Sequence, residues 1–232
     1  MLKSYLDEFA KDAIKTLEMA QADLAHLLQS VRIVVGAKSK RFFDALGKLP
    51  QQPDPAKTFF DITQPRMQIK QLISAVHGYF QIKVDPNAIE RVKISLMKPD
   101  GADLVFTDWA PEADVPNSRY ARFRGNTIAG LAFSTRRLVI SENVANDVRF
   151  FQFITGKDQG SMFAYPVIDS LLDEVVYVIN VMASKTGQFQ DTPSERQKIE
   201  KVMEIYAERM VLENRLDRIK TEVSAKQDGG VG

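Results

Sequence analysis

The 232-residue sequence contains no cysteine, and this absence excludes several kinds of chemistry. Disulfide bonds, thiolate zinc sites, cysteine nucleophiles and thioether-linked chromophores all require that residue. Histidine is scarce as well, because His26 and His77 are the only two and neither has a matching ligand near it in the sequence. Metal sites gather several ligands, so the sequence predicts no metal site and no bound cofactor. Both histidines are interpreted as structural or solvated.

The sequence also lacks a strong net charge and a long apolar run. Its 31 Lys and Arg residues and 30 Asp and Glu residues leave a net charge of +1, which gives no reason to expect a nucleic-acid partner. No segment approaches the roughly 20 apolar residues that cross a bilayer. Asp7, Glu8 and Asp12 stand where a secretory signal would be basic and then apolar. We therefore expect a cytoplasmic protein without a membrane span.

Proline density and hydrophobic periodicity predict how the chain is organised. Three prolines within six residues indicate a linker that ends one helical region and precedes a domain. The predicted parts are an N-terminal helical region (1–49), a Pro-rich linker (50–63), a domain (64–226) that closes with a long helix (191–226), and a flexible Gly-rich tail (227–232).

Apolar residues in the N-terminal region recur at alternating spacings of three and four, which is a heptad pattern. A single helix cannot bury such a stripe against itself, so the pattern predicts a partner helix. The residues of this stripe are Leu17, Ala20, Leu24, Leu27, Val31 and Val34.

The domain alternates between helical and strand patterns. Apolar residues at helical spacing predict a helix, and alternating or continuous β-branched runs predict strands. Helices are expected over 66–80, 128–133 and 144–153, and strands over 92–96, 104–109, 138–140, 162–168 and 175–182.

The closing helix has the clearest start signal in the sequence. Thr192 is followed by Pro193 and, three residues after the threonine, by Glu195, which is a capping-box pattern. Two apolar stripes about 100° apart follow, so one is expected to pack on the sheet and the other on a partner helix. The first contains Ile199, Met203, Tyr206 and Met210; the second contains Val202, Ile205, Leu212, Leu216, Ile219 and Val223.

This order of elements resembles the GAF domain family over roughly residues 64 to 212. Gly125–Gly130 is similar to the family's glycine-flanked helix, and Asn146–Phe150 to its Asp-x-Arg-Phe box. Thr135–Ser141, Ser161–Val167 and Val175–Met182 resemble its third strand, its proline-ended strand and its last strand. The resemblance implies an α+β sandwich: an antiparallel sheet with helices on one face and a ligand pocket on the other.

The resemblance further implies a regulatory or sensor protein that binds a small molecule non-covalently and signals through paired terminal helices. Chromophore-binding and sulfoxide-reducing relatives need a cysteine, which is absent, and no nucleophile–base pair or phosphate loop is visible. The sequence therefore predicts that the protein is not an enzyme. A second interpretation stays open, in which the GAF-like core is a ligand-free scaffold and the helices make the chain an adaptor or assembly subunit.

Each candidate ligand-binding residue has two interpretations. Asp147 and Arg149 either contact an anionic ligand or pair with each other to shape a loop. Ser141 and Asn143 follow the third strand and either face the pocket or turn the chain. The apolar candidates either line the pocket or belong to the core, and they are Phe106, Phe133, Phe151 and Met162.

The two terminal helices predict the partners. We expect a homodimer formed through both, with a protein partner and a small-molecule ligand as further possibilities. The predicted interface consists of Leu17, Leu24, Leu27, Val31, Leu212, Leu216, Ile219 and Val223.

Overall fold

The computed structural model describes a five-stranded antiparallel sheet flanked by helices, with the strand order β2-β1-β5-β4-β3. The described residues are 21, 24–29, 31–32, 34–45, 55–85, 91–101, 103–111, 127–150 and 160–228. The strands are β1 (Val92–Asp100), β2 (Asp103–Ala110), β3 (Val139–Ser141), β4 (Ser161–Asp169) and β5 (Glu174–Ala183). The helices are α2 (Pro55–Thr63), α3 (Pro65–Val84), α4 (Ile128–Thr135) and α5 (Pro193–Asp228).

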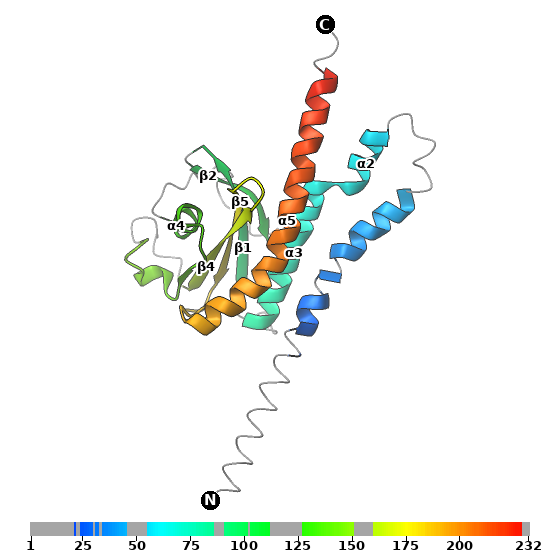
Figure 1. Ribbon diagram of the computed structural model, residues 1–232. Coiled ribbons are helices and arrows are strands. Elements are labelled where there is room, and N and C mark those ends of the chain that lie inside the picture. Colours follow the sequence, from blue (N-terminus) through cyan, green and yellow to red (C-terminus); the bar gives the residue numbers. More distant parts are fainter. Residues whose placement is uncertain are drawn as a thin grey trace, which may run out of the picture.

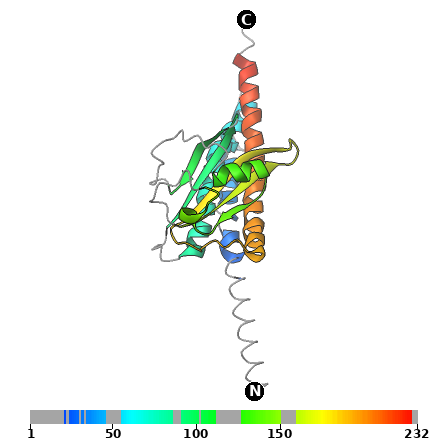
Figure 2. The ribbon, with the colours of Figure 1, turned by 90° about the vertical axis from the view of Figure 1, so that its left-hand side faces the viewer.

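The sheet separates two helical layers. Helix α4 lies on one face, and the long helices α3 and α5 lie side by side on the other (Figures 1 and 2). The N-terminal helical segment, whose described helical residues are 24–29, 31–32 and 34–45, lies beyond α3 and α5 on the side away from the sheet (Figure 1). The predicted antiparallel α+β fold is confirmed.

The larger core lies between the sheet and the α3–α5 pair. Three of its aromatic rings, those of Phe80, Phe163 and Phe189, meet edge to face at centroid distances of 4.9 to 6.0 Å. The predicted sheet-facing stripe of α5 lies in this core, because Ile199, Met203, Tyr206 and Met210 are all fully buried. The start of α5 also agrees with its sequence, since the Thr192 hydroxyl accepts the backbone N–H of Glu195 at 3.3 Å.

A smaller core lies under α4. Met97 and Val178 belong to this side, whereas the neighbouring residues Leu96 and Ile179 belong to the larger core. Side chains alternate between the two faces of a strand, so β5 is apolar almost throughout because helices cover it on both sides.

Two local predictions are wrong. Part of the expected linker forms helix α2, because Pro55 occupies its first position, where proline is tolerated. The helix expected over 144–153 is only a 3₁₀ turn, η2 (Val144–Asn146), followed by turns to Phe150, while 151–153 lie outside the described residues. Asn and Asp side chains compete for backbone hydrogen bonds here and favour turns over helix. Helix α5 also runs two residues past its expected end, to Asp228.

The N-terminal helical segment packs on the rest of the chain. Leu27 and Val34 are buried in the larger core, and Val31 packs against it. Leu27 and Val31 were expected in an interface with a partner helix; here they contact their own chain, because α3 and α5 leave an apolar groove that the segment occupies. Leu17 and Ala20 lie outside the described residues.

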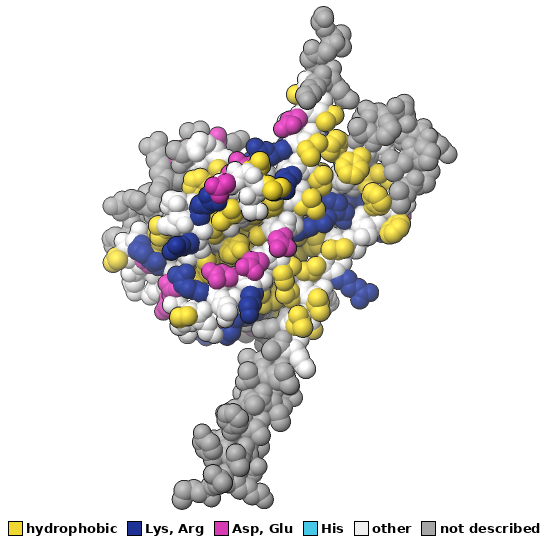
Figure 3. Space-filling model, viewed as in Figure 1, with side chains coloured by type: hydrophobic (Ala, Val, Ile, Leu, Met, Phe, Trp, Pro, Cys, Tyr) yellow, Lys and Arg dark blue, Asp and Glu magenta, His cyan; other side chains and the backbone are white. Residues whose placement is uncertain are grey.

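Apolar side chains remain exposed beside this groove. Figure 3 shows hydrophobic side chains gathered along α5 and the N-terminal helical segment. Leu24 is 56% exposed and Leu212 is 44% exposed, and Ile219 is exposed as well, whereas Leu216 and Val223 are half-buried. None of the helices in the described part of the chain combines the length and apolarity needed to cross a membrane.

Candidate ligand site on the α4 face and at the edge of the sheet

Three of the predicted apolar site residues come together on the α4 face of the sheet. Phe106 from β2, Phe133 from α4 and Met162 from β4 are half-buried and pack against the smaller core. The fourth, Phe151, lies outside the described residues. Each of these three side chains is therefore partly exposed at the margin of the smaller core.

Asn180 is a polar residue of this face that the sequence analysis missed. It lies in the middle of the apolar strand β5 and is only 7% exposed. Its amide nitrogen donates to the Ser95 hydroxyl at 3.2 Å and contacts the sulfur of Met97 at 3.4 Å. Its carbonyl oxygen is buried without a hydrogen-bond partner among the described residues. The signal in the sequence was a single polar residue inside an otherwise apolar strand. Such a residue points to a site because an unpartnered buried acceptor is unfavourable unless a ligand binds it.

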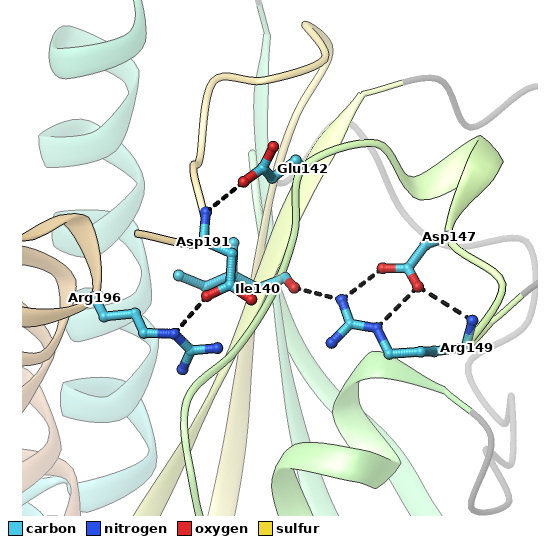
Figure 4. Close-up of polar contacts among 6 residues, drawn as sticks. All are labelled: Ile140, Glu142, Asp147, Arg149, Asp191 and Arg196. Atoms are coloured by element: carbon cyan, nitrogen blue, oxygen red, sulfur yellow. Dashed lines mark hydrogen bonds and ion pairs between the residues drawn. The ribbon is translucent and has the colours of Figure 1, made fainter. Parts of the chain in front are cut away.

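Asp147 and Arg149 form a compact ion pair. The Arg149 guanidinium donates from Nε to Oδ1 of Asp147 at 2.9 Å and from Nη2 to Oδ2 at 2.6 Å (Figure 4). The hydrogen bond from Arg149 holds the pKa of Asp147 below its usual range, and the same contact raises the pKa of Arg149. The guanidinium also lies over the ring of Phe150, 5.1 Å from its centroid, and Phe150 is anchored in the smaller core.

The ion pair is part of a cap on the outer edge of β3. Arg149 Nη2 donates to the carbonyl of Ile140 at 2.7 Å, and Arg196 Nη1 donates to the carbonyl of Leu138 at 2.9 Å. Strand β3 is the last strand in the sheet, so these carbonyls face away from any neighbouring strand. Unpaired edge groups invite pairing with other chains, and the two guanidinium groups cover them. The geometry thus agrees with the loop-shaping interpretation of Asp147 and Arg149.

The loop after β3 is tied to the entry of α5. Glu142 accepts the backbone N–H of Asp191 at 2.8 Å, and its backbone carbonyl accepts the N–H of Gly187 at 2.7 Å (Figure 4). Ser141 is fully buried, and the side-chain oxygen of Asn143 is buried without a hydrogen-bond partner among the described residues. Asn143 is therefore an unpartnered acceptor among the predicted site residues that the structure describes.

The described residues contain no group of three His, Asp or Glu side chains that could hold a metal ion. His77 has a structural contact, because its Nε2 lies 3.1 Å from the carbonyl oxygen of Val92.

The sheet is joined to α5 by buried polar contacts. The Tyr177 hydroxyl donates to the side-chain oxygen of Asn214 at 3.1 Å, and burial raises the pKa of Tyr177 to about 12. Arg215 donates to Asp169 at 2.7 Å, and Asp169 in turn accepts the backbone N–H groups of Leu171 and Leu172 in the β4–β5 turn. These contacts tie the β4–β5 hairpin to the middle of α5.

Comparisons with known proteins find likeness in structure alone. No family model matches the sequence, and no curated protein does. The GAF domain of a phosphoenolpyruvate-protein phosphotransferase from Coxiella burnetii matches with a TM-score of 0.49 at 11% identity, over 80% of this chain and 97% of that one. The corresponding Acinetobacter domain matches with a TM-score of 0.48 at 15% identity, over 68% and 84%. A free methionine-R-sulfoxide reductase from Neisseria meningitidis matches with a TM-score of 0.48 at 12% identity, over 65% and 80%.

The predicted antiparallel α+β fold with helices at both ends of the chain is confirmed by the structure, and several of the solved structures that it resembles are GAF domains. The prediction that the protein is not an enzyme, made from the absent cysteine and the absent nucleophile–base pair, is contradicted by structural neighbours that are enzymes. Free methionine-R-sulfoxide reductases from several organisms match the structure, and they are enzymes. A GAF-like fold accommodates catalysis as well as regulation, because function resides in sites placed on a fold.

Proposed function

We propose that this protein is a GAF-type regulatory module that binds a small molecule on the α4 face of its sheet and transmits occupancy through α5 to paired helices in a homodimer. The observation that carries the proposal is Asn180, a buried amide whose carbonyl oxygen has no partner among the described residues. Leaving such an acceptor unsatisfied is unfavourable by about 1–3 kcal/mol, and a ligand that donates a hydrogen bond there recovers this energy.

The surroundings of Asn180 favour a particular ligand chemistry. Phe106, Phe133 and Met162 supply partly exposed apolar surface on the same face. Small-molecule sites commonly combine apolar walls with a few polar groups that fix orientation. The proposed ligand is therefore a small, largely apolar molecule with an N–H or O–H donor, held without a covalent bond.

The effect of ligand binding is transmitted along β5 to α5. Asn180 points to the α4 side of this strand, and Tyr177, three residues away, points to the other side and contacts Asn214 on α5. A ligand shifts a conformational equilibrium only through different affinity for two states. Here the two states are arrangements of the β4–β5 hairpin against α5.

The proposed dimer uses the apolar surface beside the N-terminal groove. Leu212 and Ile219 on α5 and Leu24 on the N-terminal helical segment are exposed. A hollow of about 310 Å³ between these elements is lined by Val31, Val35, Ile205 and Leu212. Contiguous apolar patches of this kind mark interaction sites, and a second copy of the chain offers the same patch in return.

The ligand proposal is tested with Asn180→Leu, which keeps the side-chain size and removes the amide. Thermal unfolding is measured for both proteins with a panel of small metabolites. We expect at least one compound to raise the Tm of the wild type and to lose most of that effect in N180L. The ligand-free N180L protein should be at least as stable as the wild type, because an unsatisfied buried acceptor is removed. Equal ligand shifts in both proteins would contradict the assignment.

The dimer proposal is tested by measuring mass in solution for Leu212→Glu and Leu24→Glu. Each charge falls on an exposed position, so the fold should persist while the dimer dissociates. The matched control is Val148→Glu in the turn after η2, where the Val148 side chain is 87% exposed. A monomeric wild type, or a dimer that survives both substitutions, rules the interface out. If the protein is a dimer but no ligand changes its Tm, the result favours the adaptor function instead.

A further inference from the structure

A second hollow lies outside the α4-face site, at the capped edge of β3. It measures about 620 Å³ and lies between the end of α4, strand β3 and the beginning of α5. Among the described residues, its lining combines apolar side chains with three arginines and includes neither Asp nor Glu. The lining includes Leu131, Thr135, Val139, Arg137, Arg149 and Arg196.

Two of the arginines are held in fixed positions. Arg149 is fastened by Asp147 and the Ile140 carbonyl, and Arg196 by Asp191 and the Leu138 carbonyl. In Figure 4 the two guanidinium groups lie on either side of Ile140. Each keeps one terminal nitrogen, Nη1 of Arg149 and Nη2 of Arg196, without a hydrogen bond to any described residue.

Arg137 supplies the uncompensated charge. Its neighbour Arg136 adopts a left-handed conformation at the end of α4 (φ 56°) and pairs with Asp173 at 2.5 Å. This turn sends the two consecutive arginines to different places, and Arg137 lines the hollow without an ion pair in the described part of the chain. Asp147 and Asp191 offset the charges of Arg149 and Arg196, so Arg137 decides the sign of the site.

We propose that this hollow binds the phosphate group of a small phosphorylated molecule. Arginines from three separate segments line the space, which matches a tetrahedral anion with several oxygens better than a planar carboxylate with two. The fixed guanidinium groups lose little freedom on binding, and the half-buried side chain of Leu131 provides an apolar contact for the remainder of the molecule. The site is separate from the Asn180 face and does not depend on it.

The probe is inorganic phosphate, added to the full chain at low salt with selective ¹⁵N labelling of arginine. Binding is followed through the side-chain Nε–H signals of the arginines. We expect saturable shifts of the Arg149 and Arg196 signals with a dissociation constant in the millimolar range, as suits a bare phosphate group. Arg137→Gln should weaken binding by about tenfold, the effect of one charge-assisted hydrogen bond.

The matched control is Arg91→Gln, which removes an exposed arginine charge before β1. It should leave phosphate affinity unchanged, and so should Asn180→Leu. Equal weakening by R137Q and R91Q would show general electrostatic attraction and overturn the site. Absence of saturable shifts in the wild type would overturn it as well. Loss of phosphate binding in N180L would show that the hollow and the Asn180 face are one site and would contradict their separation.

Discussion

Glu213 offers the sharpest test of how the N-terminal helical segment is attached. Its carboxylate is fully buried on α5, accepts a hydrogen bond from Lys38 at 2.6 Å and forms an ion pair with Arg209 at 2.9 Å. Lys38 belongs to the N-terminal helical segment, so this ion pair joins residues 175 positions apart. Burial lowers the pKa of Lys38, and the contact with Glu213 opposes that effect. The perturbation we consider is Glu213→Gln, which preserves shape and removes the charge.

The expected destabilisation is about 2–3 kcal/mol. Removing one partner of a fully buried ion pair is unfavourable by about 3–5 kcal/mol, because the other charge stays buried and uncompensated. Two features reduce that value here. Arg209 is partly exposed and can be hydrated, and the glutamine carbonyl can still accept one hydrogen bond from Lys38.

The assay is urea unfolding of wild type, E213Q, Lys38→Met and the double variant, which form a double-mutant cycle. We expect a coupling energy of about 1–2 kcal/mol between the two positions. Asp217→Asn is the matched control, since Asp217 pairs on the same helix with Arg66, whose side chain is 81% exposed. Such surface pairs contribute about 0–1 kcal/mol. Equal small effects of E213Q and D217N, or strictly additive single variants, would refute the reasoning.

Two further predictions concern the sheet and its hairpin. Gly160→Ala should destabilise the fold strongly, by about 3 kcal/mol or more, because an added Cβ would lie 2.0 Å from the backbone oxygen of Ala183 and the residue has φ +146°. The measurement is thermal unfolding. The control is Gly78→Ala on α3, which should raise the Tm slightly because nothing lies within 4 Å of its added Cβ. The hydrogen bond from Arg215 lowers the pKa of Asp169 to about 2, so the carboxylate stabilises the fold above its usual pKa and this stabilisation is lost as the pH falls from about 4 to about 2. In urea unfolding at each pH, the stability gap between wild type and Asp169→Asn should close over that range, and a constant gap would contradict the assignment.

Sequence patterns predicted the elements whose periodicity reflects contact with the rest of the fold. The sheet-facing stripe of α5 and the apolar character of β5 follow directly from the surfaces that cover them. The turn after β3 could not be predicted in the same way. Its conformation depends on the two acceptors of the Arg149 guanidinium, which are Asp147 two residues away and the carbonyl of Ile140 nine residues away. Helical spacing carries no information about either contact.

The N-terminal stripe illustrates a second limit. A heptad pattern indicates that a helix buries one face, but it does not identify the surface that covers it. Leu27 and Val34 find that surface on α3 and α5 of the same chain, whereas Leu24 stays exposed. In this packing arrangement Lys38 also contacts Glu213. The spacing of apolar residues in either helix does not relate these two residues.

Strand β5 is where the proposed ligand site and the helices meet. Its side chains alternate, so Val178 and Asn180 face α4 while Tyr177, Ile179 and Val181 face the α3–α5 pair. A ligand that draws on Asn180 therefore acts on a strand whose adjacent residues are packed against α5. The buried contact between Tyr177 and Asn214 is the polar step of this path, and its hydrogen bond is stronger for being shielded from water. Tyr177 lies three positions before Asn180 on the same strand, so the proposed coupling runs along β5 and moves the β4–β5 hairpin against α5.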